Sequence, residues 1–138
     1  MEWKEGQYKI SDDKSLLSLE KICDLLSKSY WANKRPAETI SKSIENSICY
    51  GIYSDEEQIG FGRIITDYAT TYYICDVILD EKYRGKGLGK KLIECMIGCK
   101  DFSDCQGMLG TKDAHGLYQQ YGFIKDEKSF MRRPPSIL

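Results

Sequence analysis

The sequence predicts an α/β fold in which helices pack on a mixed β-sheet. Apolar residues at helical spacing come first, between residues 14 and 44, and three strand-like segments follow, between residues 47 and 79. From the last of these segments on, the order is strand, helix, strand, helix, strand, which allows a parallel pair of strands joined by a helix. A length of 138 residues favours a single domain, 1–138, with one core.

The first third of the chain predicts a short strand and two helices. Residues 8–10 suit the strand, and the Ser-Asp-Asp group at 11–13 offers caps for a helix over 14–28. The apolar face of this helix contains Leu16, Leu19, Cys23 and Leu26. After a loop over 30–35, Pro36 suits the first position of a second helix. The apolar stripe of that helix contains Ile40 and Ile44.

The middle third predicts an antiparallel meander of three strands. These strands are expected over 47–53, 58–66 and 72–79. The polar group at 54–57 suits a turn, and the segment 67–71 is short enough to close a hairpin. Together these segments predict three neighbouring strands in one sheet.

The last third predicts two more helices and two more strands. A helix over 88–99 has one apolar side, which contains Leu88, Leu92, Met96 and Cys99. A short strand over 107–111 follows, and then a helix over 114–121, which Asp113 can cap and Gly122 ends as a left-handed residue. A last strand or strand pair is expected over 123–131, from Phe123, Ile124, Phe130 and Met131.

Composition excludes several classes of function. The net charge of −1 gives no general electrostatic support for a nucleic acid or a membrane surface as partner. No apolar run is long enough to span a bilayer, and residues 1–14 are polar, unlike a signal peptide. We therefore expect a cytoplasmic location, in which the six cysteines are reduced thiols, and the lack of a Cys-x-x-Cys pair argues against a metal site.

The most informative segment is Arg84-Gly85-Lys86-Gly87-Leu88-Gly89, called the glycine loop below. It joins a predicted strand to the start of a predicted helix, where backbone N–H groups are unpaired and the helix dipole is positive. Glycines let the backbone approach a phosphate closely. A P-loop is excluded because Gly89 precedes two lysines, and a dinucleotide fold is disfavoured by the G-x-G-x-G spacing and the upstream hairpin.

The sequence resembles the Gcn5-related N-acetyltransferases (GNAT). The family's cofactor signature, Gln or Arg followed by x-x-Gly-x-Gly or Ala, is matched by Arg84, Gly87 and Gly89. The strand segment 76–83 resembles the family's fourth strand, and the segment 117–123 resembles its late motif with a tyrosine and Gly-Phe. The resemblance is strong over 72–123 and weaker over nearly the whole chain. It implies the GNAT fold, with a splayed central strand pair.

The resemblance implies acetyl-CoA as cofactor and an amine as acceptor. Backbone N–H groups of Gly85, Lys86, Gly87, Leu88, Gly89 and Lys90 would bind the pyrophosphate, with help from the side chains of Arg84, Lys86 and Lys90. The pantetheine arm would lie along Val77, Ile78 and Leu79 like an added strand. Thr111 stands where many members have a pantetheine-binding asparagine. The expected reaction is direct transfer of acetyl to a primary amine of a small molecule or peptide. The alternative is an acyl-CoA-binding sensor or interaction module of the same fold without turnover.

Two residues are the catalytic candidates that the resemblance implies. Tyr118 matches the tyrosine that protonates the departing thiolate, and the alternative is that only its ring matters, for packing. Asp76 is a candidate general base that contacts the acceptor, and the alternative is a carboxylate bonded to Tyr or Arg across the sheet. Tyr30 and Trp31 lie in the loop that walls the acceptor pocket in the family. The oligomeric state stays open, with a homodimer as a candidate because dimers are common in the family.

Overall fold

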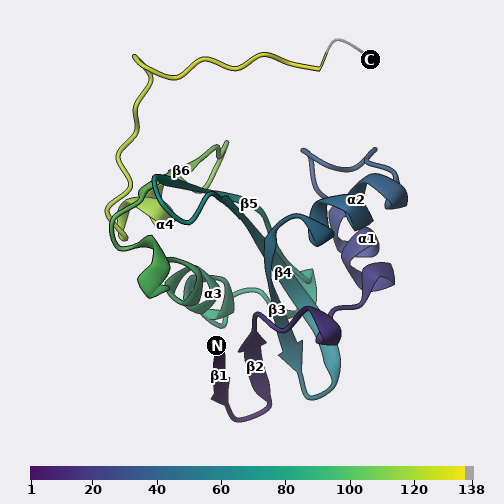
Figure 1. Ribbon diagram of the computed structural model, residues 1–138. Coiled ribbons are helices and arrows are strands. Elements are labelled where there is room, and N and C mark those ends of the chain that lie inside the picture. The colour runs from purple at the N-terminus through teal and green to yellow at the C-terminus, as the bar shows by residue number, and fades with distance from the viewer. Residues whose placement is uncertain (136–138) are drawn as a thin grey trace.

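The computed structural model describes residues 1–135, and its six strands form one sheet in the order β1-β2-β3-β4-β5-β6 (Figure 1). The strands are β1 (Glu2–Glu5), β2 (Tyr8–Ser11), β3 (Ile48–Ser54), β4 (Glu57–Thr66), β5 (Thr71–Leu79) and β6 (Gln106–Leu109). The helices are α1 (Leu19–Ser27), α2 (Ala37–Glu45), α3 (Leu88–Ile97) and α4 (His115–Gln119), with short 3-10 helices η1 (Lys14–Leu16), η2 (Glu81–Tyr83) and η3 (Lys100–Phe102). The first five strands are antiparallel neighbours, and β6 runs parallel to β5. The predicted mixed sheet is therefore confirmed.

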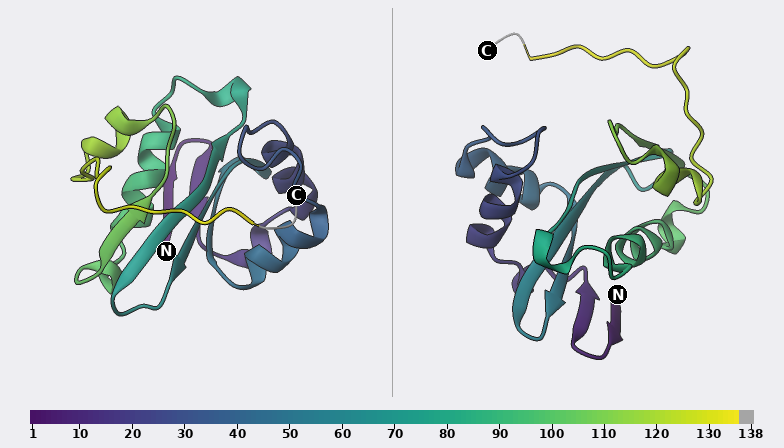
Figure 2. Two further views of the ribbon diagram at one scale, coloured as in Figure 1. Left: turned by 90° about the horizontal axis from the view of Figure 1, so that it is seen from above. Right: turned by 180° about the vertical axis from the view of Figure 1, so that it is seen from behind.

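Helices cover both faces of the sheet. α1 and α2 lie on one face, and α3 and α4 lie on the other (Figure 2). The α1–α2 side has a core that contains Ile22, Leu25, Leu26, Ile40, Phe61 and Ile78. The α3 side has a larger core that contains Ile10, Tyr50, Ile52, Ile64, Leu92 and Met96. The alternation of strand residues between two apolar layers gives the sheet its stability on both faces.

Close packing of α3 on the sheet depends on Gly62 of β4. A Cβ at this position would lie 2.9 Å from Met96 Sδ and 3.2 Å from Leu92 Cδ2. Any larger residue would therefore force the Met96 and Leu92 side chains to repack, because interior side chains leave little free volume. Since the glycine loop ends at the first turn of α3, Gly62 helps to fix the loop against β5.

The predicted helix over 14–28 is broken in two. Asp13 accepts a hydrogen bond from Ser15 N at 2.9 Å and starts η1, which ends at Leu16. α1 begins only at Leu19, after Ser18 as its N-cap, because the Ser18 hydroxyl accepts from Lys21 N at 3.2 Å. Two capping side chains five residues apart thus compete for the helix start, and the second one begins the longer helix.

The N-terminal hairpin was not predicted from the sequence. β1 pairs with β2 along its whole length, and Gly6 in the turn has a φ of 59°. The sequence of β1, Glu-Trp-Lys-Glu, lacks the apolar pattern of a strand because β1 is a short edge strand with mostly exposed side chains. Only Trp3 of this strand is partly buried, against the core on the α3 side.

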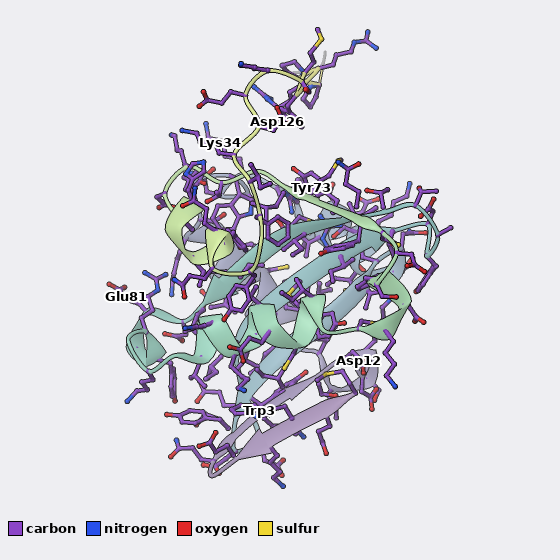
Figure 3. All side chains as sticks on the ribbon, turned by 90° about the vertical axis from the view of Figure 1, so that its left-hand side faces the viewer. Trp3, Asp12, Lys34, Tyr73, Glu81 and Asp126 are labelled. Carbon is purple, nitrogen blue, oxygen red and sulfur yellow. The ribbon has the colours of Figure 1, made fainter. Side chains whose placement is uncertain are left out.

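The predicted last strand over 123–131 is wrong. Residues 123–135 contain no strand, and Figures 1 and 3 show this segment standing clear of the sheet, with Asp126 labelled in Figure 3. Ile124 and Met131 are 88% and 93% exposed. The segment is instead held locally, since Lys128 N and Ser129 N donate to the Asp126 carboxylate at 3.2 Å. An apolar pattern predicts a strand only where a neighbouring strand pairs with it.

The remaining elements agree with the sequence apart from their ends. The strand expected over 107–111 forms at Gln106–Leu109, and the helix expected over 114–121 is limited to His115–Gln119. Gly122 has the expected positive φ, 87°. Within residues 1–135 there is no helix with both the length and the apolar content that crossing a membrane requires.

Candidate active site

The glycine loop has the backbone shape that its sequence predicts. Gly85 and Gly87 have φ values of 81° and 79°, in the left-handed region that glycine tolerates best. No heavy atom lies within 4 Å of a Cβ built at either residue, so both faces of the loop are open. A close approach of another molecule's atoms to this backbone is therefore sterically free.

The loop ends at helix N–H groups without partners. Gly87 is the N-cap of α3 and has no side chain to cap the helix, and the first turn contains no acidic residue. Lys91 N is the first amide to bond back into the helix, to Gly87 O at 3.0 Å. The amides of Leu88, Gly89 and Lys90 precede it, and in an α-helix such amides have no intrahelical acceptor. Together with the helix dipole they form an anion-binding site.

The basic side chains around the glycine loop differ in whether they are free to attract an anion. Arg84, Lys86 and Lys90 are exposed, and Arg84 Nε donates to Leu79 O at 3.3 Å, which ties the loop to the end of β5. Lys91 instead lies 3.1 Å from Glu94 and 5.3 Å from the centre of the Trp3 ring. The side of the loop near β1 and β2 borders a cavity of about 400 Å³, lined in part by Trp3 and Lys86.

The edge of β5 is unpaired where the glycine loop begins. β6 pairs with β5 only from Thr71 to Ile74, so the two strands separate beyond that point, as predicted for the splayed pair. β4 continues to pair with the other edge of β5 up to Leu79. Ile78 is buried on the α1 side, while Val77 and Leu79 pack against the core on the α3 side. Residues 76–79 therefore offer backbone groups to an extended ligand on one edge.

A bulge places Asp76 at the start of this unpaired segment. The register between β4 and β5 shifts between Phe61 and Arg63, and Asp76 has a φ of 54°, which is strained for a residue with a side chain. The Asp76 residue is only 5% exposed. A carboxylate in such a position needs partners, since an unpaired buried charge costs several kcal/mol.

Three donors from two other parts of the chain satisfy the Asp76 carboxylate. Its Oδ1 accepts from Trp31 Nε1 at 2.9 Å. Its Oδ2 accepts from Arg35 Nη1 at 2.8 Å and from Arg63 Nε at 3.0 Å. We call Trp31, Arg35, Arg63 and Asp76 the aspartate cluster. It connects the α1–α2 loop to the sheet at the point where β5 and β6 separate.

Tyr118 lies buried in α4 against the core. The residue is 8% exposed and its ring packs edge-on against Phe123, with centroids 5.9 Å apart. Burial, and to a lesser extent the nearby Tyr30 and Asp113, raises the pKa of Tyr118 to about 12. Its hydroxyl makes no hydrogen bond to any residue between 1 and 135. Tyr118 is thus a protonated phenol at neutral pH whose donor is free.

The α1–α2 loop and the loop before α4 meet through Tyr30. The Tyr30 hydroxyl accepts from Lys112 N at 3.2 Å, and Lys112 Nζ lies 5.2 Å from the centre of the Tyr30 ring. Tyr30 also packs edge-on against Trp31, with centroids 5.0 Å apart. The α1–α2 loop therefore contacts both β5, through Asp76, and the segment after β6, through Lys112. The sequence alone gave no signal for Lys112.

Thr111 has a local role in the structure. Its hydroxyl oxygen accepts from Ala114 N at 3.1 Å, so it helps to start α4 in place of the expected Asp113 cap. The hydroxyl hydrogen stays available as a donor. A pantetheine contact of Thr111 therefore stays a prediction.

The structure brings most of the candidate residues together and changes one pairing. The glycine loop, residues 76–79 and Tyr118 lie around the splay between β5 and β6. Asp67 takes no part in the cluster, because it accepts from the Thr70 hydroxyl and from Thr70 N, Ala69 N and Thr71 N in the hairpin, which lowers its pKa. Arg63 binds Asp76, so the cross-sheet partner of Asp76 that the sequence left open is an arginine.

Comparison with known proteins gives one family. The model of the acetyltransferase (GNAT) domain matches residues 45–125, which include β4, β5, the glycine loop, α3 and Tyr118. The match begins at the end of α2, so it leaves out Tyr30, Trp31 and Arg35. The α1–α2 loop is thus the part of the candidate site that lies outside the family match.

Solved structures and curated relatives agree with this match. A structure from Xanthomonas campestris pv. campestris, described as belonging to the GNAT family, has a TM-score of 0.89 and 34% identity over 96% of each chain. A GNAT family acetyltransferase from Elizabethkingia anophelis with acetyl-CoA bound shares the fold, with a TM-score of 0.66 and 21% identity over 88% of this chain and 80% of its own. A protein of Gibberella zeae that is provisionally named an acetyltransferase, FG08082, is 29% identical over 93% of this chain and 85% of its own length.

Proposed function

The chain belongs to the GNAT family of acetyltransferases, and on this premise we propose that it transfers an acetyl group from acetyl-CoA to a primary amine of a small molecule or peptide. The observation that carries the proposal is the continuity of the site. Open helix amides at the glycine loop lead along the unpaired edge of β5 to the buried phenol of Tyr118. Acetyl-CoA supplies the thioester, and the protein supplies binding, orientation and a proton donor.

The residues at the glycine loop fit a pyrophosphate. The positive φ values of Gly85 and Gly87 and the free space around them admit the phosphate oxygens, and the amides from Leu88 to Lys90 would donate to them. The side chains of Arg84, Lys86 and Lys90 are exposed and would add charge attraction. Backbone groups of Val77, Ile78 and Leu79 would bind the pantetheine arm in the manner of an added strand.

Tyr118 would give the proton that the departing thiolate needs. Its raised pKa, about 12, keeps a proton on Oη throughout the neutral range. The ring is buried against the core on the α3 side, which fixes the position of this donor. Free N–H groups on the unpaired edge of β5 would stabilise negative charge that develops on the carbonyl oxygen.

For Asp76 we propose a positioning role. Both of its oxygens already accept strong hydrogen bonds, and removal of a proton from an amine would require it to give up one of them. Held in place, the carboxylate fixes Trp31 and Arg35 beside the splay. The acceptor amine would then lose its proton to water. The general-base role stays a prediction, and the Asp76 test in the Discussion separates the two.

The compartment is proposed on the state of the cysteines. All six are free thiols. Free thiols persist in a reducing compartment, which supports the cytoplasm as the location.

Two measurements test the proposed function. Isothermal titration with acetyl-CoA and with CoA should give saturable binding, and release of free CoA should follow when amines are added. The absence of any CoA binding would refute the proposal. Tight CoA binding without CoA release over a broad amine panel would favour the sensor alternative, because that result separates binding from turnover. Tyr118→Phe serves as the control for turnover, since it keeps the packing of the ring.

A further inference from the structure

The aspartate cluster carries an excess of positive charge. Two guanidinium groups, of Arg35 and Arg63, share the single carboxylate of Asp76, which leaves one positive charge uncompensated. Within residues 1–135, Asp76 is the one carboxylate in ion-pair contact with either arginine. The excess charge lies at the bulge, at the start of the unpaired edge of β5, where the acceptor has to approach.

The two arginines differ in what they can still bind. The Arg63 side chain is 10% exposed, and its Nε and Nη1 are bound to Asp76 and to the Ser47 hydroxyl. The Arg35 side chain is 25% exposed, and only its Nη1 has a partner among the described residues. Arg35 therefore presents free N–H donors toward solvent, in the planar arrangement that matches a carboxylate or a phosphate.

More cations lie on the same side of the site. Lys112 is held over the Tyr30 ring, which belongs to the same loop as Arg35. Lys34, the residue before Arg35, is exposed and lies at the same end of the molecule as Tyr73 of β5 (Figure 3). Cations therefore lie on both sides of the splay, with the exposed Asp113 beside Lys112 as an acidic neighbour, and the uncompensated charge is that of the aspartate cluster.

We propose that the acceptor is a primary amine that also carries an anionic group, a carboxylate or a phosphate, which binds the free donors of Arg35. This inference rests on the proposed function and names its substrate class. A local excess of positive charge repels polycations such as polyamines and attracts an anionic group. The same charge disfavours the protonated form of a nearby amine, so that the neutral nucleophile is easier to reach.

Arg35 can be removed without leaving Asp76 unpaired. After Arg35→Gln, the carboxylate still accepts from Arg63 Nε and from Trp31 Nε1. The buried ion pair then has equal and opposite charges, so the fold is preserved. Arg35→Lys keeps the charge but loses the planar pair of donors. Lys42→Gln on α2 is the matched control, because it removes one exposed cation away from the site.

The first experiment compares acceptors in matched pairs by CoA release. One arm pairs amino acids with their carboxamides, and the other pairs amino-alcohol phosphates with the free amino alcohols, so the two arms separate carboxylate from phosphate. We expect an anionic member to have a kcat/KM about tenfold or more above its neutral partner, mainly through KM, as one charge-assisted hydrogen bond provides. Arg35→Gln should remove this preference. Arg35→Lys should retain part of it, and Lys42→Gln should retain all of it. A preference for neutral or polycationic amines, or one that survives Arg35→Gln, would overturn the proposal.

The second experiment does not depend on the acceptor. The protein is the Trp3→Phe variant, in which Trp31 is the remaining tryptophan, and it is first saturated with CoA so that the pyrophosphate site is filled. Inorganic phosphate or acetate is then added while the fluorescence of Trp31 is measured. A saturable change is expected because Trp31 and Arg35 bind the same carboxylate, and Arg35→Gln should abolish it. No response of the wild-type cluster to either anion overturns the proposal. Failure of CoA to bind in the first step would instead refute the proposed function, so the two failures are distinguishable.

Discussion

The glycine loop and the aspartate cluster lie at opposite ends of the same short strand segment and are built in different ways. The glycine loop consists of six consecutive residues, mostly exposed, whose work is done by backbone N–H groups. The aspartate cluster joins side chains from α1–α2, β4 and β5, and its carboxylate is almost completely buried. The first is local in sequence, and the second exists only in the folded protein.

The difference teaches how donor and acceptor recognition are separated in this protein. A phosphate can be held by backbone geometry alone, so one loop is sufficient and a family pattern detects it. The acceptor site that we propose depends instead on side chains held by long-range contacts, Trp31 and Arg35 on Asp76. Such a cluster changes when any one of three elements changes, and acceptor specificity can therefore vary while the donor site stays the same.

The largest expected effect is on the stability of the aspartate cluster. Asp76→Asn removes the only carboxylate between two guanidinium groups and should lower the free energy of unfolding by about 3 kcal/mol, the cost of breaking a buried ion pair. Urea denaturation measures this loss. Arg35→Gln, which leaves an equal pair, should cost far less, and the double variant should recover part of the loss.

The same Asp76 variant decides its role in turnover. If Asp76 only positions Trp31 and Arg35, the Arg35→Gln variant should reproduce its rise in KM, and the pH profile of kcat should keep its acidic limb in Asp76→Asn. A loss of that acidic limb with normal stability would instead identify Asp76 as the general base. In that case Asp76 would take part in proton transfer as well as holding Trp31 and Arg35 in place.

The second effect concerns Tyr118, which belongs to neither region and lies in α4 against the core on the α3 side. Tyr118→Phe should lower kcat by about 100-fold, as loss of a general acid does, while the affinity for CoA changes little. The measurement is steady-state kinetics beside titration with CoA. Tyr121→Phe, which removes a hydroxyl bound to Glu94 at 2.9 Å, is the matched control and should keep kcat. An unchanged kcat in Tyr118→Phe would show that Tyr118 serves packing and not proton donation.

The third effect sharpens the backbone role of the glycine loop. Gly87→Ala forces a side chain into a positive φ of 79°, which costs about 1–2 kcal/mol, and should weaken CoA binding about tenfold. Gly6→Ala, with a φ of 59° in the β1–β2 turn, has similar strain but should leave CoA affinity unchanged. Equal losses of affinity in both variants would show that the effect is general strain rather than a phosphate contact.

The smallest effect is the alkaline limit of stability. Burial raises the pKa of Tyr118 to about 12 in the folded state, whereas an unfolded tyrosine loses its proton near its ordinary pKa of 10.0. The contribution of Tyr118 is therefore complete below pH 10 and decreases as the pH rises toward 12. Between pH 10 and 11 the wild type should lose about 1 kcal/mol more than Tyr118→Phe in urea denaturation. An equal pH dependence of both proteins would contradict the burial of this phenol.

The elements predicted from the sequence were correct where local patterns decide. The meander formed because alternating apolar residues on β3, β4 and β5 face the two cores. The final strand over 123–131 failed because its apolar residues found no partner strand. β1 was missed for the opposite reason, since its polar residues pair with β2 through the backbone and need no apolar face.

The sequence by itself determined the glycine loop, the strand before it and the position of Tyr118, because a left-handed turn between strand and helix strongly favours glycine and the motif is contiguous. The tertiary structure alone decided the partners of Asp76, since Arg35 and Arg63 are 41 and 13 residues away and only the bulge in β5 turns the carboxylate toward both. A buried charge takes whichever donors the fold brings within hydrogen-bond distance, and here that choice leaves two guanidinium groups on one carboxylate.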